Sequence, residues 1–206
     1  MLAVRFSQVT NGMPSATSFV VSGTAVFQST VTCNAAMTFS NQGVATMQSS
    51  VVGSCTLSVQ DAAQLTFLSS GANTVGSVVN VGSGATLRTA GAGSVTFSNT
   101  IQSYGIATVD AASTICLAAF QNFGVWRVDN AASSAQFGST LTNNVGGLFA
   151  VGSANAVTIN ILSNSGVVVL SKTVGGVTFL SSVGEGQLMS VVYATREKRG
   201  ADVAAN

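Results

Sequence analysis

The feature that most constrains this chain is a self-similarity with a period near 20 residues. In the second half four units follow one another, at 106–124, 125–146, 147–166 and 167–186. Each begins with an alternating apolar and polar strand, passes a small polar turn, continues into a second apolar strand and closes near a Gly. A period of roughly 20 residues made of strands and turns predicts a solenoid, because one such unit cannot bury its apolar face alone.

The first half repeats the pattern less regularly, in units at 19–43, 55–76 and 77–105. The segment from Val59 carries an Asp and a pair of Ala and so echoes the segments from Val109 and Val128. We interpret these as one turn that recurs along the solenoid.

Composition supports an all-β fold. Only 6% of residues are charged, and Pro occurs once. Like charges stacked about 4.8 Å apart on successive coils would repel, and Pro would remove a hydrogen bond from the ladder. We therefore expect one parallel β-helix of roughly eight coils of about 20 residues each. Its expected parts are an N-terminal segment or cap (1–18), the solenoid (19–193) and a polar tail (194–206). The alternative, a β-sandwich of short strands, does not explain the self-similarity.

Short Asn-containing motifs carry a family resemblance. The segments 39–43, 97–99, 120–124 and 162–166 look like the F-x-N tetrads of polymorphic bacterial surface β-helices. Over roughly 19–186 the chain resembles the right-handed parallel β-helix of the pectin-lyase-like superfold and of bacterial surface passengers. The resemblance implies an architecture and no particular activity.

Several function classes are excluded by composition. The chain has no His, so imidazole catalysis and His-ligated metals are absent. A net charge of +1 does not favour nucleic acid as a partner. No apolar run reaches the roughly 18 residues of a membrane-spanning helix. The segment Met1–Phe6 has no apolar core of a signal peptide. We expect no cofactor and no metal.

Two of the three cysteines have a spacing that matters. Cys33 and Cys55 are about one coil apart, so they form either a disulfide or a stacked pair of reduced, buried thiols. Cys116 is left over and is expected to be buried. No two cysteines have C-x-x-C spacing, which excludes a zinc site or a thioredoxin-like motif.

Asp110 and Asp129 are a candidate carboxylate pair, since they lie one coil apart with Arg127 nearby. Three roles are open: bonds to their own turn backbone, a bound cation, or glycoside hydrolysis, which in inverting enzymes needs carboxyl groups about 6.5–9.5 Å apart. The turn role is the one we expect, because carboxylates and surface aromatics are too few for a sugar-cleaving groove.

Aromatic residues gather in three consecutive coils. They are Phe120, Phe123, Trp126, Phe137 and Phe149. We expect an internal stack; a platform for a sugar or a protein partner is the alternative.

A basic tetrad lies near the C-terminus. Arg196, Lys198 and Arg199 form an R-x-K-R sequence that resembles a furin-type processing site. The alternative is a solvated polar tail after the last strand.

The expected function follows from the low charge and the open ends of a solenoid. We expect a non-enzymatic structural or surface protein, extracellular or on a cell surface, that associates with itself end to end or face to face into filaments or layers. An adhesin that uses loop 143–147 to bind a surface glycan or protein receptor is the main alternative. Ice binding, for which only Thr30-Val31-Thr32 has the T-x-T pattern, and a polysaccharide-active enzyme are lesser ones.

Overall fold

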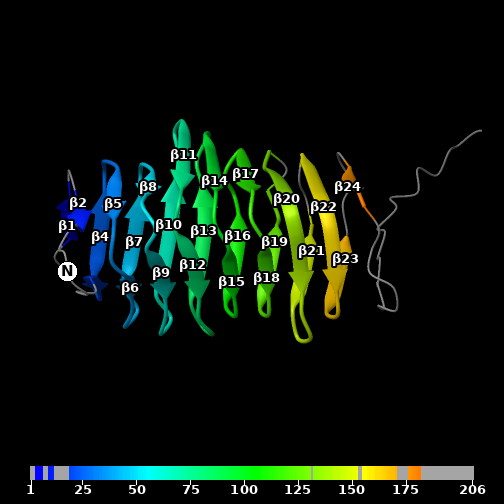
Figure 1. Ribbon diagram of the computed structural model, residues 1–206, viewed down its shortest axis with the longest axis horizontal. Coiled ribbons are helices and arrows are strands. Elements are labelled where there is room, and N and C mark those ends of the chain that lie inside the picture. Colours follow the sequence, from blue (N-terminus) through cyan, green and yellow to red (C-terminus); the bar gives the residue numbers. More distant parts are fainter. Residues whose placement is uncertain are drawn as a thin grey trace, which may run out of the picture.

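A computed structural model describes residues 3–6, 9–11, 19–130, 132–152, 155–170 and 176–181. These residues form strands and turns and contain no helix, which confirms the all-β prediction. The strands stack in a row along one axis as a parallel β-solenoid of about eight turns (Figure 1). The solenoid has three faces, named here face 1, face 2 and face 3 in the order in which a coil visits them.

Face 1 is a nine-stranded parallel sheet. Its strands are β1 (Ala3–Phe6), β4 (Thr24–Phe27), β7 (Val44–Met47), β10 (Gln64–Leu68), β13 (Thr86–Ala90), β16 (Ile106–Val109), β19 (Val125–Val128), β21 (Leu148–Val151) and β23 (Val167–Leu170).

Faces 2 and 3 belong to one 15-stranded sheet. Face 2 contains β2 (Val9–Asn11), β5 (Val31–Cys33), β8 (Val51–Val52), β11 (Ala72–Val75), β14 (Ser94–Phe97), β17 (Ser113–Cys116) and β24 (Val177–Phe179). Face 3 contains β3 (Phe19–Val21), β6 (Met37–Phe39), β9 (Thr56–Val59), β12 (Val78–Val81), β15 (Ile101–Ser103) and β18 (Phe120–Asn122). The long strands β20 (Ser134–Asn143) and β22 (Ala156–Asn164) serve both faces and join them.

The repeat has the expected length but, before Val125, one more strand per coil than the sequence suggests. Register partners on face 1 lie 19 to 23 residues apart. The coils before Val125 have three short strands where the sequence pattern indicates two, whereas β20 and β22 make the coils that begin at Val125 and Leu148 two-stranded, as predicted. In the coil that begins at Ile106, only Leu117–Ala119 separates β17 from β18. Because that corner is itself apolar and small, the two strands look like one in the sequence.

The phase of the repeat is correct in the second half and wrong in the first. The predicted units starting at 106, 125, 147 and 167 coincide, to within one residue, with β16, β19, β21 and β23. The units predicted from Phe19, Cys55 and Ser77 begin instead on or just before face 3. The lengths of the corners between strands vary in the first coils, so the sequence pattern does not reveal that these coils also begin on face 1.

The ladders begin earlier than the expected start of the solenoid. Strand β1 pairs in parallel with β4, and β2 pairs in parallel with β5. Part of segment 1–18 therefore continues the solenoid rather than standing apart from it. The polar tail 194–206 lies outside the described residues.

Buried and solvent-facing residues alternate along the strands, and the inward-facing side chains form the core. In β4, β6 and β9, for example, every second side chain points inward and is buried. The largest fully buried side chains are mainly Phe, with Met, Leu and Ile. Burying each contributes roughly 1.5–3 kcal/mol. Outward positions carry mainly Thr, Ser, Gln and small apolar residues.

An asparagine ladder replaces apolar packing at one inward corner of the later coils. Asn122, Asn143 and Asn164 are register partners and are fully buried. The Asn122 Nδ2 donates to Asn143 Oδ1 at 2.8 Å, and Asn143 Nδ2 donates to Asn164 Oδ1 at 2.7 Å. Of the four F-x-N-like segments, those at 120–124 and 162–166 therefore belong to one structural position. Segment 39–43 lies at the same corner, between faces 3 and 1, but Phe39 rather than Asn41 occupies the register position of Asn122. Asn99 lies at a different corner, between β14 and β15.

Candidate functional site

The two candidate carboxylates occupy equivalent positions on neighbouring coils. Asp110 follows β16 and Asp129 follows β19, and the register of these strands pairs Ile106 with Val125. Asp61 is not part of this set, because it follows β9 on face 3 and lies in a turn with φ of 51°. The sequence echo between segment 59–63 and the two later Asp turns is therefore misleading.

Each carboxylate pairs with an arginine. Asp110 Oδ2 accepts from Arg88 Nε at 2.7 Å, and Asp129 Oδ2 lies 3.2 Å from Arg127 Nε. The expected bonds from these carboxylates to their own turns are replaced by ion pairs. At side-chain exposures of 51% and 29% for Arg88–Asp110, and 53% and 55% for Arg127–Asp129, such pairs stabilise the fold by about 1 kcal/mol or less.

The four charged residues line a shallow groove of about 390 Å³ on the outside of face 1. Thr86, Ile106 and Thr108 complete its lining. Both carboxylates are at least partly exposed to solvent, and each is paired with a guanidinium group. Within the described ranges no three His, Cys, Asp or Glu side chains come together as metal ligands would. The groove therefore holds two positive and two negative side chains.

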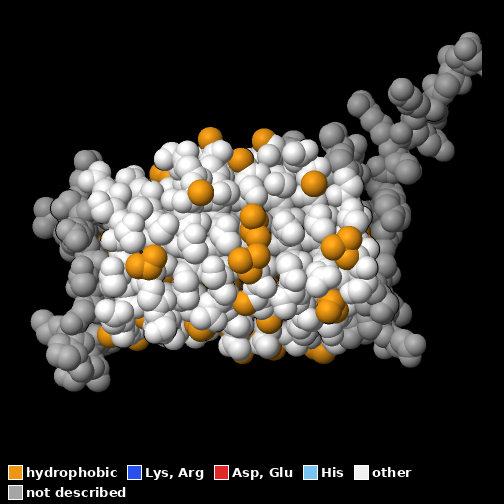
Figure 2. Space-filling view, turned by 45° about the horizontal axis from the view of Figure 1, so that its top comes forward, with side chains coloured by type: hydrophobic (Ala, Val, Ile, Leu, Met, Phe, Trp, Pro, Cys, Tyr) orange, Lys and Arg blue, Asp and Glu red, His pale blue; other side chains and the backbone are white. Residues whose placement is uncertain are grey.

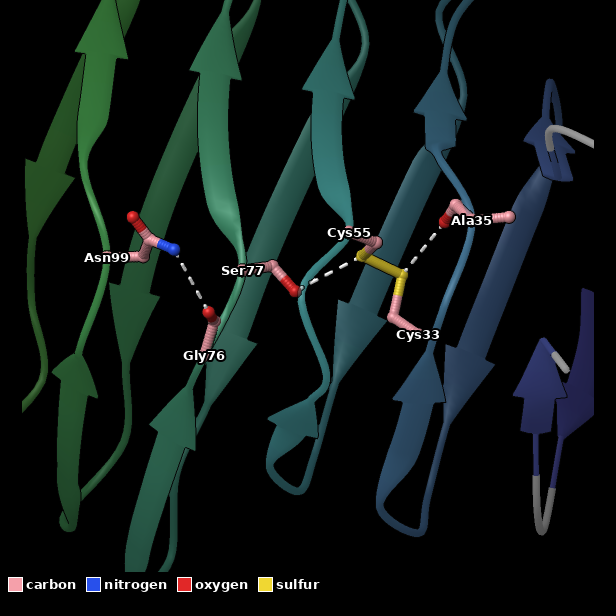
Figure 3. Close-up of a disulfide and its surroundings, with 6 residues drawn as sticks. All are labelled: Cys33, Ala35, Cys55, Gly76, Ser77 and Asn99. Carbon is pink, nitrogen blue, oxygen red and sulfur yellow. Dashed lines mark hydrogen bonds between the residues drawn. A yellow bond between two sulfur atoms is a disulfide. The ribbon is translucent and has the colours of Figure 1, made fainter. Parts of the chain in front are cut away.

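Cys33 and Cys55 are joined by a disulfide, with their Cα atoms 5.5 Å apart (Figure 3). Cys33 ends β5, and Cys55 lies just before β9 on the next coil, so the bond crosses a corner diagonally. The Ser77 hydroxyl donates to Cys55 Sγ at 3.1 Å, since a disulfide sulfur carries no hydrogen. The Cys33 Sγ makes only a close contact, 3.2 Å, with the carbonyl oxygen of Ala35. The disulfide ties together two early coils.

Cys116 is a free, buried cysteine, as expected. Burial raises the pKa of its thiol from 9.0 to about 12. Burial therefore disfavours the thiolate, which is the nucleophilic form.

Most of the clustered aromatics form an internal stack. Phe120, Trp126, Phe137 and Phe149 are all buried, and Trp126 stacks on Phe149 with ring centroids 4.5 Å apart. The internal interpretation is confirmed for these four residues.

Phe123 lies at the corner between faces 3 and 1 and stacks on Tyr104 of the preceding coil. The ring centroids are 4.5 Å apart and the planes differ by 8°. Tyr104 is 51% exposed. Tyr104 was not among the residues predicted from the sequence. The available signal was the repeated aromatic-Gly pair, Tyr104-Gly105 and Phe123-Gly124, placed directly before a face 1 strand.

An apolar row lies beside this stack, on the outer side of face 1. It consists of Ile106, Val125, Leu148 and Val167, which are register partners across β16, β19, β21 and β23. Ile106 is 41% exposed and Val167 is 51% exposed, whereas Val125 and Leu148 between them are half-buried. The row was not predicted from the sequence, because there its four residues are simply the first positions of four strands.

The loop 143–147 divides into a buried and an exposed part. Asn143 belongs to the asparagine ladder, whereas Val145 is 80% exposed. The basic residues Arg196, Lys198 and Arg199 lie outside the described residues.

Comparisons with protein families, curated proteins and solved structures find no significant match for this chain. In the part of the chain that the structure describes, no helix is long and apolar enough to cross a membrane.

Proposed function

We propose that this protein is a non-enzymatic structural component that associates with itself, outside the cell or on its surface. The observation that carries the proposal is the nearly uncharged exterior. The described residues include only three Arg and three Asp, and four of these six pair with each other in one groove. Among the described residues that Figure 2 shows, no charged side chain is visible on this face of the solenoid. Surface charge is what normally keeps folded proteins apart.

The ends of the sheets give a route for growth. Among the described residues, β1 pairs with β4 alone and β23 pairs with β21 alone. An edge strand presents unpaired N–H and C=O groups that template further pairing. End-to-end contact would continue the same parallel ladder from one molecule into the next, and contact between faces would assemble such rods into layers.

The disulfide supports a location outside the cytosol. Disulfides persist in oxidising compartments and are rare where thiols are kept reduced. The Cys33–Cys55 bond therefore favours an extracellular or surface role.

The test is light scattering and electron microscopy of the purified protein over a range of concentrations. We expect the mean mass to rise with concentration and regular filaments or layers to form, with a repeat near 4.8 Å along the axis. A protein that stays monomeric at the highest attainable concentration contradicts the proposal.

A second candidate function, binding to a surface glycan or protein receptor, is favoured by one observation. The exposed Val145 and the surface stack of Tyr104 on Phe123 lie on neighbouring coils and present apolar groups to solvent. A monomer with saturable binding to glycans or cell surfaces would favour this function over self-association.

A further inference from the structure

One face of the solenoid carries a band of apolar side chains in exact register with its strands. The apolar row of Ile106, Val125, Leu148 and Val167 follows four neighbouring strands of face 1. Because parallel strands lie about 4.8 Å apart, these side chains form a straight line along the axis. Scattered single apolar residues are normal on a protein surface, whereas a contiguous group marks an interaction site.

The aromatic stack widens this row. Tyr104 and Phe123 each precede a member of the row by two positions, and Val145 precedes Leu148 by three. Tyr104 is 51% exposed and Val145 80% exposed. The row together with Tyr104, Phe123 and Val145 is called the apolar band. Tyr and Phe are enriched at protein interfaces, where large rings bury much area at a low cost in side-chain entropy.

The rim of the band carries balanced charge. Arg88, Asp110, Arg127 and Asp129 border its first strands, with two residues of each sign. Each arginine meets its aspartate through Nε, so the two amino groups of each guanidinium remain for a further carboxylate. Asp129 is 55% exposed and has room to accept a further bond. A neutral rim of this kind does not select a strongly acidic or basic partner, whereas it complements a second surface with the same two signs.

We propose that the apolar band and its charged rim form the surface on which a second copy of this chain docks, same face against same face. This inference rests on the proposed self-association and assigns its contact surface to the outer side of face 1. A second copy supplies apolar side chains opposite the band and carboxylates opposite the free guanidinium amino groups. Self-complementary contact of this kind closes as a twofold dimer, which pairs two solenoids side by side.

The test replaces the row by the residue that already occupies its column earlier in the sheet. Thr24 and Thr86 lie in the same outward column, so face 1 accepts Thr there. The row variant is I106T/V125T/L148T/V167T. The matched control is V20T/V52T/L117T, which changes exposed apolar residues outside the band, with exposures of 56%, 40% and 52%.

Sedimentation equilibrium of the full chain measures the dimer dissociation constant. We expect the row variant to weaken dimerisation at least tenfold and the control to stay within twofold of the wild type. Circular dichroism melting curves establish that each variant is folded. If the row variant does not fold, Y104S replaces it; this variant removes the half-exposed ring that stacks on Phe123, with an expected weakening of threefold or more.

The outcomes separate this inference from the proposed function. A row variant that associates as tightly as the wild type overturns the inference and leaves self-association to another surface. A control that weakens association as much as the row variant also overturns it. A wild-type chain that is monomeric at every concentration overturns both.

Discussion

The early and late coils fill one inward column of face 3 in opposite ways. The column runs, from the first coil to the last, through Val21, Phe39, Val59, Val81, Ser103, Asn122, Asn143 and Asn164. All eight side chains are buried. The backbone ladder is therefore indifferent to whether this position is apolar or polar, provided that the buried groups find partners.

The two solutions differ in what each coil requires of its neighbours. A buried Val or Phe requires only space that fits its side chain. A buried Asn requires hydrogen-bond partners, which here are the side-chain amides of the neighbouring coils. Each Nδ2 of the ladder also donates to a backbone carbonyl, as Asn122 Nδ2 does to the Leu148 oxygen. The first acceptor of the ladder, Asn122 Oδ1, and the hydroxyl of its register partner Ser103 both lack a hydrogen bond. The column changes from apolar to polar residues at Ser103 and Asn122, and buried polar atoms without a hydrogen bond lie at this change.

The early coils have a covalent tie, and the late coils have a cluster of large rings. The Cys33–Cys55 disulfide fixes two early coils, whereas Trp126 packs against Phe120, Phe137 and Phe149 in the late ones. Three substitutions test how much the ring cluster, the disulfide and the asparagine ladder each contribute to stability.

The largest effect is expected from Trp126→Ala. Ala occupies the same inward column at Ala45 and Ala107, so the strand itself tolerates the change. The rings around Trp126 would still enclose a cavity, and the free energy of unfolding should fall by about 3–5 kcal/mol. Urea unfolding followed by circular dichroism measures it. Leu65→Ala in an early coil is the control; a larger loss there would contradict a dominant role for the ring cluster.

Removing the disulfide should cost somewhat less. Closing a 22-residue loop stabilises a fold by about 3 kcal/mol in the chain-entropy account. The double variant C33A/C55A should lose that amount, and its amide hydrogens should exchange faster mainly in the early coils. Hydrogen exchange resolved by peptide measures both. Cys116→Ala provides the control for loss of a thiol alone, and uniform acceleration along the chain would contradict a local tie.

The smallest effect is expected within the asparagine ladder. Asn143→Leu removes the middle amide of the ladder. Asn122 Nδ2 then loses one acceptor, and Asn164 Oδ1 loses its donor from Asn143. Stability should fall by about 2 kcal/mol. Asn164→Leu, at the end of the ladder, should cost less in the same urea titration. Equal costs would mean that the ladder acts as independent residues rather than as a connected chain.

Much of the fold could be predicted from the sequence. The period, the parallel solenoid, the absence of helix in the described residues and the inward alternation all follow from spacing and composition. The third strand of the coils before Val125 could not be predicted, since a corner such as Leu117–Ala119 looks like a continuation of its neighbours. The phase of the early coils was also hidden, because a shift of corner length changes the sequence pattern without changing the ladder.

The candidate site was predicted only in part. The one-coil spacing of Asp110 and Asp129 placed them together, but their partners were not apparent. Arg88 lies one coil before Asp110, and nothing in its local sequence points to that contact. The stack of Tyr104 on Phe123 likewise depends on which corner each ring occupies.

The sequence by itself determined the architecture, because a short period and a near absence of charge leave a stacked ladder as the way to bury so many small apolar strands. Only the tertiary structure decided which side chains meet across coils. Residues about 20 apart in sequence become neighbours about 4.8 Å apart, and a difference of one residue in corner length changes which of them face each other. For that reason the disulfide, the asparagine ladder, the ion pairs and the apolar band emerged only when the coils were set in register.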